Sequence, residues 1–502
     1  MSTVSKPAAV GPLPVSELDE LLVTYPFGNS EYVTSEMHRC YKRRLASISE
    51  RVPLARDVLE ALDRADPYVL YRVMGDTAFR CAVQHLHVQI EDEIPYGMPP
   101  ERCHEILKGS LQSLKGKVPG LIGSALSDRV GGEPFHGWVW REDCPETIFT
   151  EAFRSIVDDH YGLTLHTPSS DELTALAEAV RLLGEVLPNI SRSVLSHTHL
   201  VAVFAPTGQW ATTRSSSEFR ISGTIFLSQR TLSNVWALAE HILHESLHQQ
   251  LYDIRAGHSL LAPDFARADA PLVHSLWNMP DSTRGNYWDI HRTLAAFHVY
   301  VHLALFARAA REPAEGKQYT ARYGPAQMVG PNTALARARY LGDQLRQQGW
   351  AELGPAGRQI VDWLHSVLEV VDADPIVQGS FVHLLLDRYW RESSMVRSLA
   401  AVQTVDTELL PQFSRLLQEE LDCARSVLGT LGYDLTSFDE ALGSFGSEES
   451  FERFASVRGL IAETLLRACP ERYVLSSSHA ADDRVRRMVE ESSETLRKLL
   501  GR

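Results

Sequence analysis

The sequence predicts a mainly α-helical protein of the α+β class, with a small mixed or antiparallel sheet beside one buried helix. Three observations lead to this prediction. Apolar residues recur at helical spacing over most of the 502 residues. Two short runs, at 199–205 and 220–228, are rich in β-branched and aromatic residues. A long apolar segment that contains a pair of histidines follows the second run.

The first region, residues 1–165, is expected to be helical. Apolar positions recur every three or four residues in three segments, at 54–62, 69–88 and 103–114. We expect His85 and His87 to be structural, because residues two apart on a helix face different directions. The region therefore predicts a helical N-terminal part that carries no chemical motif.

The second region, residues 166–310, is expected to hold the catalytic part. The polar run Ser169-Ser170-Asp171-Glu172 opens a helix that reaches about residue 187. The two strand-like runs follow, and then a helix at 231–253 that ends near Gly257 as its C-cap. A strand directly before a metal-binding helix is typical of a zincin-like core, in which a sheet edge can pair with an extended peptide.

The rest of the chain is expected to be a linker followed by helices. Residues 311–333 are rich in Gly, Pro and charge and predict a loop or linker. Residues 334–502 predict a C-terminal helical region that serves as a scaffold or a partner surface. Its expected helices lie at 334–348, 358–371, 377–391, 409–428, 449–468 and 481–500.

Composition limits the possible partners and compartments. The formal net charge of −15 disfavours nucleic acid or an anionic membrane as the principal partner. Six cysteines without CxxC spacing indicate neither a zinc ribbon nor a disulfide framework. The N-terminus has no hydrophobic signal segment, and the apolar stretch 293–310 contains histidines and an arginine. We therefore expect a cytoplasmic protein in which that stretch is a buried helix.

The residues His244-Glu245-Ser246-Leu247-His248 form an HExxH motif inside the predicted helix 231–253. Residues four apart on a helix share a face, so both imidazoles can converge on one cation, with Glu245 beside them. Apolar residues surround the motif on nearly every side: Trp236, Leu238, Ile242, Leu243, Leu247 and Leu251. Because bare imidazoles and a carboxylate are costly in such a core, the pattern predicts a mononuclear metal site.

A third protein ligand is expected downstream, on a helix predicted at 287–310. His291, His298 and His302 lie in a narrow arc of this helix. His291 and His298 are seven residues apart, about 10 Å along the axis, so both cannot bind one ion. His298 and His302 could form a second ligand pair or could be core histidines, and Asp289 offers a carboxylate on another side of the helix.

Residues 171–310 resemble the HExxH-motif domain family, the 2-oxoglutarate-dependent HExxH-type peptide β-hydroxylases of bacterial natural-product pathways. The segments that carry the resemblance are LTALAEAVRLLGEVLPNI, SSSEFRISGTIFLS and LAEHILHESLHQQL, followed by Trp277 and by Arg284 seven residues before His291. Gly285 is a departure, since members of the family tend to have Pro after the arginine. The resemblance implies that His244, His248 and His291 bind Fe(II).

An iron oxygenase makes specific demands on the protein. Fe(II) held by three protein ligands keeps positions open for a bidentate 2-oxoacid and O2. The distal carboxylate of 2-oxoglutarate is best held by a guanidinium, for which Arg284 and Arg292 are the candidates, with Arg214 behind them. The substrate implied is an amino-acid side chain, free, carrier-bound or within a peptide. The shape of the substrate pocket decides between these three forms of the substrate. The sequence determines neither that shape nor the oligomeric state.

Two other functions fit the same motif. In a zinc-dependent metallopeptidase, Glu245 would be the general base that takes a proton from the attacking water. In a structural metal domain of a helical assembly protein, the ion would stabilise the fold only. Residue chemistry does not separate iron from zinc, because both accept imidazole and carboxylate ligands. The resemblance is what favours the hydroxylase.

Overall fold

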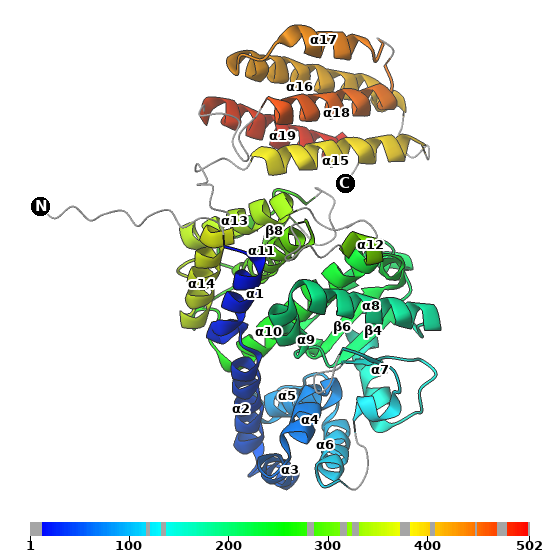
Figure 1. Cartoon of the computed structure of the whole chain (residues 1–502), viewed down its shortest axis with the longest axis vertical. Helices are drawn as coiled ribbons and strands as arrows, with labels where there is room; N and C mark the ends of the chain where they lie inside the picture. The colour runs from blue at the N-terminus through cyan, green and yellow to red at the C-terminus, as the bar shows by residue number, and fades with distance from the viewer. Residues whose placement is uncertain are drawn as a thin grey trace, which may run out of the picture. The chain divides into compact units, whose positions relative to one another are not determined.

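The computed structural model describes most of the chain, and the chain forms two compact units (Figure 1). The described residues are 13–116, 121–131, 137–278, 286–311, 319–323, 331–371, 382–401, 407–446, 449–468 and 479–499. Unit 1 comprises Met1–Phe265, Leu294–Leu335 and Trp350–Val371. Unit 2 comprises Ala266–Thr293, Ala336–Gly349 and Asp372–Arg502.

The fold class predicted from the sequence is confirmed, since helices dominate and the principal sheet is small and mixed. Seven helices lie before residue 161: α1 (Val15–Thr24), α2 (Ser30–Ile48), α3 (Pro53–Asp63), α4 (Pro67–Gly75), α5 (Thr77–Glu91), α6 (Pro100–Leu114) and α7 (Ile148–His160). The single helix expected at 69–88 is two helices. Asp76 separates α4 from α5 because its backbone is extended and its carboxylate accepts the N–H of Phe79 as the N-cap of α5.

The principal sheet of unit 1 is built around two buried parallel strands. Its strands are β1 (Arg129–Val130), β2 (Gly137–Val139), β3 (Leu165–His166), β4 (Leu200–Phe204), β5 (Ser215–Ser216) and β6 (Thr224–Ser228), in the order β1-β2-β4-β6-β5, with β3 paired to β4. All residues of β4 and β6 are buried, which explains their continuous apolar character. Strand β5 runs antiparallel to β6 at the sheet edge.

Both strands expected from the sequence are present, although the second is shorter than predicted. Residues Phe219–Ile221 form a 3-10 turn, and Gly223 has a φ of 91°, so the strand begins only at Thr224. A positive φ of this size favours glycine, because it has no Cβ. An ideal Cβ there would also lie 2.8 Å from the carbonyl oxygen of Gly75.

The helices around the sheet follow the sequence closely. Helix α8 (Ser170–Val186) begins with a capping box between Ser169 and Glu172, and α9 (Pro188–Leu195) follows it. The motif helix is α10 (Val235–Gly257), which packs against β6, α8 and α9 (Figure 1). It starts four residues later than expected because Gln229–Ser233 form a 3-10 helix, and Asn234 caps α10 through the N–H of Ala237.

Gly257 was expected to cap the motif helix, and this expectation is wrong. The residue is helical, and the cap position is His258, whose backbone is extended. An ideal Cβ on Gly257 would lie 3.1 Å from Cβ of Glu36 on α2. Glycine is therefore used here for the close approach of α2 to α10.

Helix α11 (Ile290–Arg311) begins three residues later than predicted, because Tyr287–Trp288 form strand β8, which pairs with β7 (Val273–His274). Among the described residues, α11 is the one helix long and apolar enough to cross a membrane, but 78% of its most apolar window is buried within the structure. Most of this helix is therefore buried inside the protein, in agreement with the prediction of a buried helix at 293–310.

The remaining helices include each one predicted for the C-terminal region, together with two that were not predicted. They are α12 (Tyr319–Tyr323), α13 (Pro331–Gln347), α14 (Pro355–Val371), α15 (Val382–Ala401), α16 (Leu410–Thr430), α17 (Leu435–Gly443), α18 (Phe451–Arg467) and α19 (His479–Leu499). The helix predicted at 377–391 is the least accurate, because α15 ends ten residues later, at Ala401, and residues 377–381 lie outside the described residues. Helix α12 lies in the expected linker, and α17 was not predicted. Figure 1 shows α15 to α19 side by side in unit 2.

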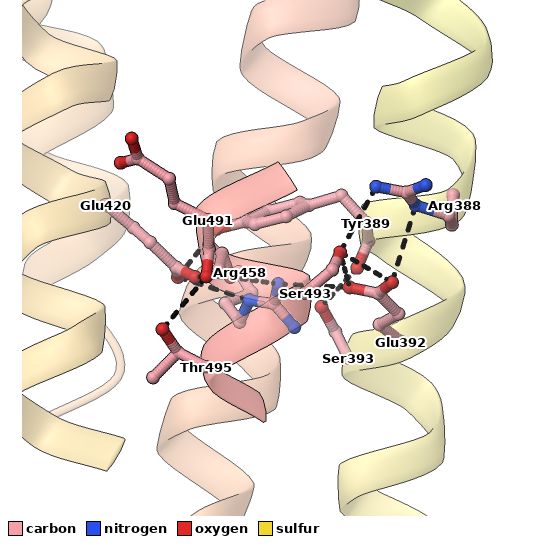
Figure 2. Close-up of polar contacts among 10 residues, drawn as sticks. Arg388, Tyr389, Glu392, Ser393, Glu420, Arg458, Glu491, Ser493 and Thr495 are labelled. Carbon is pink, nitrogen blue, oxygen red and sulfur yellow. Dashed lines mark hydrogen bonds and ion pairs between the residues drawn. The ribbon is translucent and has the colours of Figure 1, made fainter. Parts of the chain in front are cut away.

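A buried ionic network links the helices of unit 2, and Figure 2 shows it in close-up. The carboxylate of Glu420 accepts hydrogen bonds from Tyr389 Oη at 2.8 Å, from Arg458 Nε at 3.1 Å and from Ser492 Oγ. The guanidinium of Arg458 lies 3.9 Å from the centre of the Tyr389 ring. Nearby, Ser493 Oγ lies 2.8 and 2.9 Å from the two carboxylate oxygens of Glu392.

Candidate metal centre

Three side chains on α10 converge as the HExxH spacing predicts. The possible ligand atoms of His244, Glu245 and His248 all lie within 4.8 Å of one another. The two imidazole centroids are 4.9 Å apart, and His244 Nε2 lies 4.0 Å from Glu245 Oε1. Side-chain exposure is 30% for His244 but 4% for Glu245, so the cluster lies at the border between core and surface. Two imidazoles and a carboxylate in this arrangement fit a divalent transition metal.

The rest of the motif helix is buried, as predicted. Its apolar residues Trp236, Leu238, Ile242, Leu243, Leu247 and Leu251 are each at most 2% exposed. The helix is also attached to the sheet by polar contacts from Gln249, whose amide oxygen accepts the N–H of Gly223 at 2.7 Å and whose amide nitrogen donates to the carbonyl of Thr224 at 2.7 Å. These contacts fix the rotation of α10, because Gln249 follows His248 directly.

A buried charge cluster lies on the side of α10 opposite to the metal ligands. Asp253 is 2% exposed, and its carboxylate accepts hydrogen bonds from Arg80 Nη1 at 2.8 Å and from His197 Nδ1 at 2.7 Å. Burial alone would raise the pKa of Asp253, but Arg80 and His197 hold that pKa below its usual value. The carboxylate therefore stays ionised and fixes α10 to α5 and to the turn before β4.

Two half-buried tyrosines and the sheet edge lie on the Glu245 side of the motif. Tyr161 Oη and Ser216 Oγ are 3.3 Å apart, and Ser215 Oγ and His241 Nδ1 are 3.0 Å apart. Burial, together with nearby groups that include Glu245, raises the pKa of Tyr161 and of Tyr252. Both phenols are therefore neutral at physiological pH, and β5 flanks the site as the edge strand that the zincin-like order predicts.

His298 and His302 lie on the part of α11 that belongs to unit 1. His302 Nδ1 is 2.8 Å from the carbonyl oxygen of His298, which is the contact of a core histidine. Neither ring nitrogen of His298 has a hydrogen-bond partner among the described residues, although the side chain is fully buried. Burial lowers the pKa of His298, and the charges of His302 and then His248 lower it further. Among the described residues, the cluster of possible ligand atoms comprises His244, Glu245 and His248 and does not include His298, so a role of His298 as third ligand stays a prediction.

His291 occupies the first turn of α11, in the part of this helix that belongs to unit 2, and is half-buried. Its assignment as third ligand stays a prediction. In the same turn, the guanidinium of Arg292 lies 4.6 Å from the centre of the Trp288 ring, and its backbone N–H donates to Asp289 Oδ1 at 2.8 Å. Asp289 therefore caps the first turn of α11. Its other carboxylate oxygen, Oδ2, lies 2.9 Å from Arg267 Nη2.

The other arginines proposed for 2-oxoglutarate are Arg284 and Arg214. Arg284, like Gly285, lies outside the described residues. Arg214 is exposed and directly precedes β5, where its backbone carbonyl accepts the N–H of Ser228. The role of either arginine as a carboxylate ligand stays a prediction.

Sequence reasoning missed the residues that hold the motif helix in place. Arg80, His197 and Asp253 come from three distant segments, and only Asp253 lies near the motif. A usable signal was present at Arg80, which is the one Lys, Arg, Asp or Glu between residues 77 and 90, and Asp253 lies on the predicted buried helix. Such charges are seldom buried unless they are paired, so each predicted a partner of opposite sign.

Comparison with known proteins adds no assignment at this point. The sequence matches no protein-family model and no curated protein. The interpretation of the site therefore rests on its residues, on their geometry and on the resemblance described above.

Proposed function

We propose that the protein is a mononuclear non-haem iron, 2-oxoglutarate-dependent hydroxylase of amino-acid side chains in a natural-product pathway. The observation that carries this proposal is the cluster of His244, Glu245 and His248 on a buried helix. The sequences that flank the cluster resemble those of the HExxH-type hydroxylases. We further propose that the protein acts in the cytoplasm on a free, carrier-bound or peptide-borne amino acid, with neither nucleic acid nor membrane as partner.

Each residue of the proposed site has a separate role. His244 and His248 hold Fe(II), and the buried carboxylate of Glu245 places a negative charge beside it. Bound Fe(II), with 2-oxoglutarate and O2, supplies the oxidation of an unactivated C–H bond that side chains cannot perform. Arg284 or Arg292 binds the distal carboxylate of 2-oxoglutarate, because a guanidinium matches a carboxylate in a bidentate manner.

The rival function is a zinc-dependent metallopeptidase, and one observation favours it. Strand β5 is a sheet edge beside the motif helix, and an extended peptide can pair with such an edge. Glu245 would then act as the general base for the attacking water. A peptide substrate bound to β5 would serve a peptide hydroxylase equally well, so the edge strand alone does not decide between the two functions.

The deciding experiment combines metal analysis with product analysis. Protein purified without oxygen is given Fe(II), 2-oxoglutarate, O2 and a panel of amino acids and peptides, and succinate is measured together with substrate mass. A hydroxylase yields succinate and a mass gain of one oxygen atom. Stoichiometric zinc in the isolated protein, with peptide cleavage and no succinate, would overturn the proposal in favour of the peptidase.

Variants separate catalysis from folding. We expect His244→Ala to reduce succinate formation by more than about 100-fold while the protein stays folded. The matched control is His104→Ala, since His104 is a half-buried histidine on α6, outside the HExxH motif, whose Nδ1 lies 2.6 Å from the carbonyl oxygen of Pro100. If His244→Ala unfolds the protein and His104→Ala does not, a structural metal domain is the better interpretation.

The third ligand is tested by a pair of variants on α11. We expect His291→Ala to weaken Fe(II) binding by about 10-fold or more and to alter the Co(II) absorption spectrum, which reports ligand number. We expect His298→Gln to keep the Co(II) spectrum of the unmodified protein. The reverse pattern would assign the third position to His298.

A further inference from the structure

One face of the motif helix α10 is accessible to solvent on both sides of the metal ligands. Between residues 237 and 255, the half-buried or exposed residues are Ala237, His241, His244, His248, Tyr252 and Arg255, and the others are buried. Neighbours in this set are three or four residues apart, so the set forms a single line along the helix, here called the accessible stripe. A large molecule bound at the metal can therefore extend along the stripe.

The chain segment that begins with β5 runs beside the accessible stripe. Ser215 Oγ lies 3.0 Å from His241 Nδ1, before the metal ligands. Beyond the ligands, Tyr252 Oη donates to the carbonyl oxygen of Ser217 at 3.5 Å, and the rings of Tyr252 and Phe219 are 5.6 Å apart. The segment and the stripe therefore follow the same direction, and the metal ligands lie between their first and last contacts.

Arg255 is the one Lys or Arg of the accessible stripe, and aromatic rings connect it to the metal ligands. Its guanidinium carbon lies 4.1 Å from the centre of the Phe219 ring, a cation–π contact that holds the side chain in place. Phe219 contacts Tyr252, whose ring is stacked on that of His248 with 6.2 Å between the ring centres. The guanidinium is thus on the same side of α10 as the metal ligands.

The spacing along α10 sets the size of a molecule that contacts both the metal and Arg255. Arg255 follows His248 by seven residues, which is about 10 Å along the helix axis. Side chains of a helix lean towards its N-terminus, so the guanidinium lies nearer to the ligands than its Cα does. In an extended peptide, about 10 Å corresponds to about three residues.

The other charges near Tyr252 are negative. Burial raises the pKa of Tyr252, and the charges of Glu245 and Glu218 raise it further, so the phenol is neutral. These two carboxylates repel an anion that lies near the tyrosine. Apart from the metal itself, Arg255 is therefore the place on the accessible stripe where an anionic group is favoured.

We propose that Arg255 binds a carboxylate of the substrate, and that the substrate is a peptide. The carboxylate belongs to an acidic side chain or to the C-terminus, about three residues from the amino acid at the metal. A guanidinium matches a carboxylate in a bidentate manner, and the exposed position of Arg255 suits a large molecule that arrives from solvent. This inference rests on the proposed function, which assigns the distal carboxylate of 2-oxoglutarate to a different arginine.

The test uses metal-binding probes in matched pairs, the monohydroxamates of succinic, adipic and suberic acid and the corresponding terminal amides. The full chain is loaded with Co(II), and binding is followed by calorimetry and by the Co(II) absorption spectrum. The hydroxamate group binds the metal in every probe, so the two members of a pair differ only in the charge of the tail. We expect suberic monohydroxamate to bind about 10-fold or more tightly than its amide, with a smaller difference for the shorter succinic pair.

Variants assign this preference to one residue and to one ligand. We expect Arg255→Gln to remove the advantage of the carboxylate tail, and Arg64→Gln, at an exposed arginine on α3, to leave it unchanged. The affinity for 2-oxoglutarate should change by less than about 3-fold in Arg255→Gln. An equal loss for 2-oxoglutarate would place the carboxylate of the cosubstrate on Arg255 and overturn the assignment to the substrate.

The inference and the proposed function fail in different ways. Hydroxamates bind zinc as well as cobalt, so the comparison of tails remains valid if the protein is a zinc peptidase. A protein that forms succinate but shows no preference for a carboxylate tail of any length would overturn this inference alone. A preference that survives Arg255→Gln in the folded variant would overturn it as well.

Discussion

Each unit of this protein contains a buried charge cluster, and the two clusters differ in which kind of side chain has ring or guanidinium nitrogens without a hydrogen-bond partner. In unit 2, the carboxylate of Glu420 accepts three hydrogen bonds and that of Glu392 accepts the hydroxyl of Ser493, whereas the guanidinium nitrogens Arg388 Nε and Arg458 Nη1 have no hydrogen-bond partner among the described residues. In unit 1, Asp253 is equally well satisfied by Arg80 and His197. The imidazoles near Asp253, however, have ring nitrogens without a hydrogen-bond partner among the described residues.

Near Asp253, three histidines each have a buried ring nitrogen without a hydrogen-bond partner among the described residues. These nitrogens are His38 Nε2, His197 Nε2 and His199 Nδ1. A partly satisfied network is less stable than a satisfied one, so it needs a reason to persist. The unit 2 cluster joins the helices of a bundle to one another, whereas the unit 1 cluster fixes the motif helix to α5 and to the turn before β4. The comparison teaches that a buried charge pair can stabilise a bundle in one unit and position the helix of a candidate site in the other.

The largest expected effect is in unit 2. Arg458→Ala leaves the buried carboxylate of Glu420 without its cation and should lower the free energy of unfolding of the bundle by about 3–5 kcal/mol. Hydrogen exchange of the amides of α15, α16, α18 and α19 measures this loss. Metal content should not change.

The control for this variant lies on the same helix. Arg467 forms an exposed pair with Glu463 on α18, and Arg467→Ala should cost less than about 0.5 kcal/mol. Equal effects of the two variants would show that burial of the network is not what stabilises the bundle.

The second effect concerns the anchor of the motif helix. Asp253→Asn keeps the shape but removes the charge that Arg80 and His197 share, and it should destabilise unit 1 by about 2–3 kcal/mol. Because Asp253 faces away from the histidine ligands on α10, Fe(II) affinity should change by less than about 10-fold. A collapse of metal affinity in a folded variant would instead make the cluster a direct support of the ligands.

The effect that is smallest at neutral pH is the response to acid. Burial lowers the pKa of His38 and of His85 in unit 1 to about 4. The unfolded chain takes up these protons as pH falls below about 6.5, whereas the folded chain does not. Each histidine should therefore remove about 1.4 kcal/mol of stability per pH unit between pH 6.5 and pH 4, with no effect above that range.

A single substitution tests this pH dependence. His85 Nδ1 accepts the N–H of Met98, and His85→Asn keeps an acceptor near that position without a titrating ring. The slope of unit 1 stability against pH should become shallower by the contribution of one histidine. An unchanged slope in denaturation measurements at several pH values would contradict the prediction.

Local sequence patterns predicted the helices and strands of this fold. They did not predict the contacts between residues that lie far apart in the sequence. The capping run at Ser169, the buried run of β4 and the HExxH spacing are all local signals, and the structure has a helix, a strand and a converged cluster at these places. The start of α10 was misplaced because a 3-10 helix continues the same apolar pattern. Gly257 was misinterpreted because its role depends on α2, which is more than 200 residues away in the sequence.

The candidate site was predicted to the extent that it lies on one helix. His244, Glu245 and His248 need only helical geometry to converge. The partners of Asp253 come from α5 and from the turn before β4, and no periodicity connects these segments. The sequence did not predict the division into two units either, because each unit combines three separate stretches of the chain.

The narrow gap between Gly257 and Glu36 bears on how this protein could be shortened. A fragment that keeps only residues 171–310 contains the metal-binding motif but lacks both α2 and Arg80. It would expose the surface of α10 that α2 now covers and would leave Asp253 without its guanidinium. The smallest autonomous catalytic fragment must therefore begin before α2, far upstream of the segment that resembles known hydroxylases.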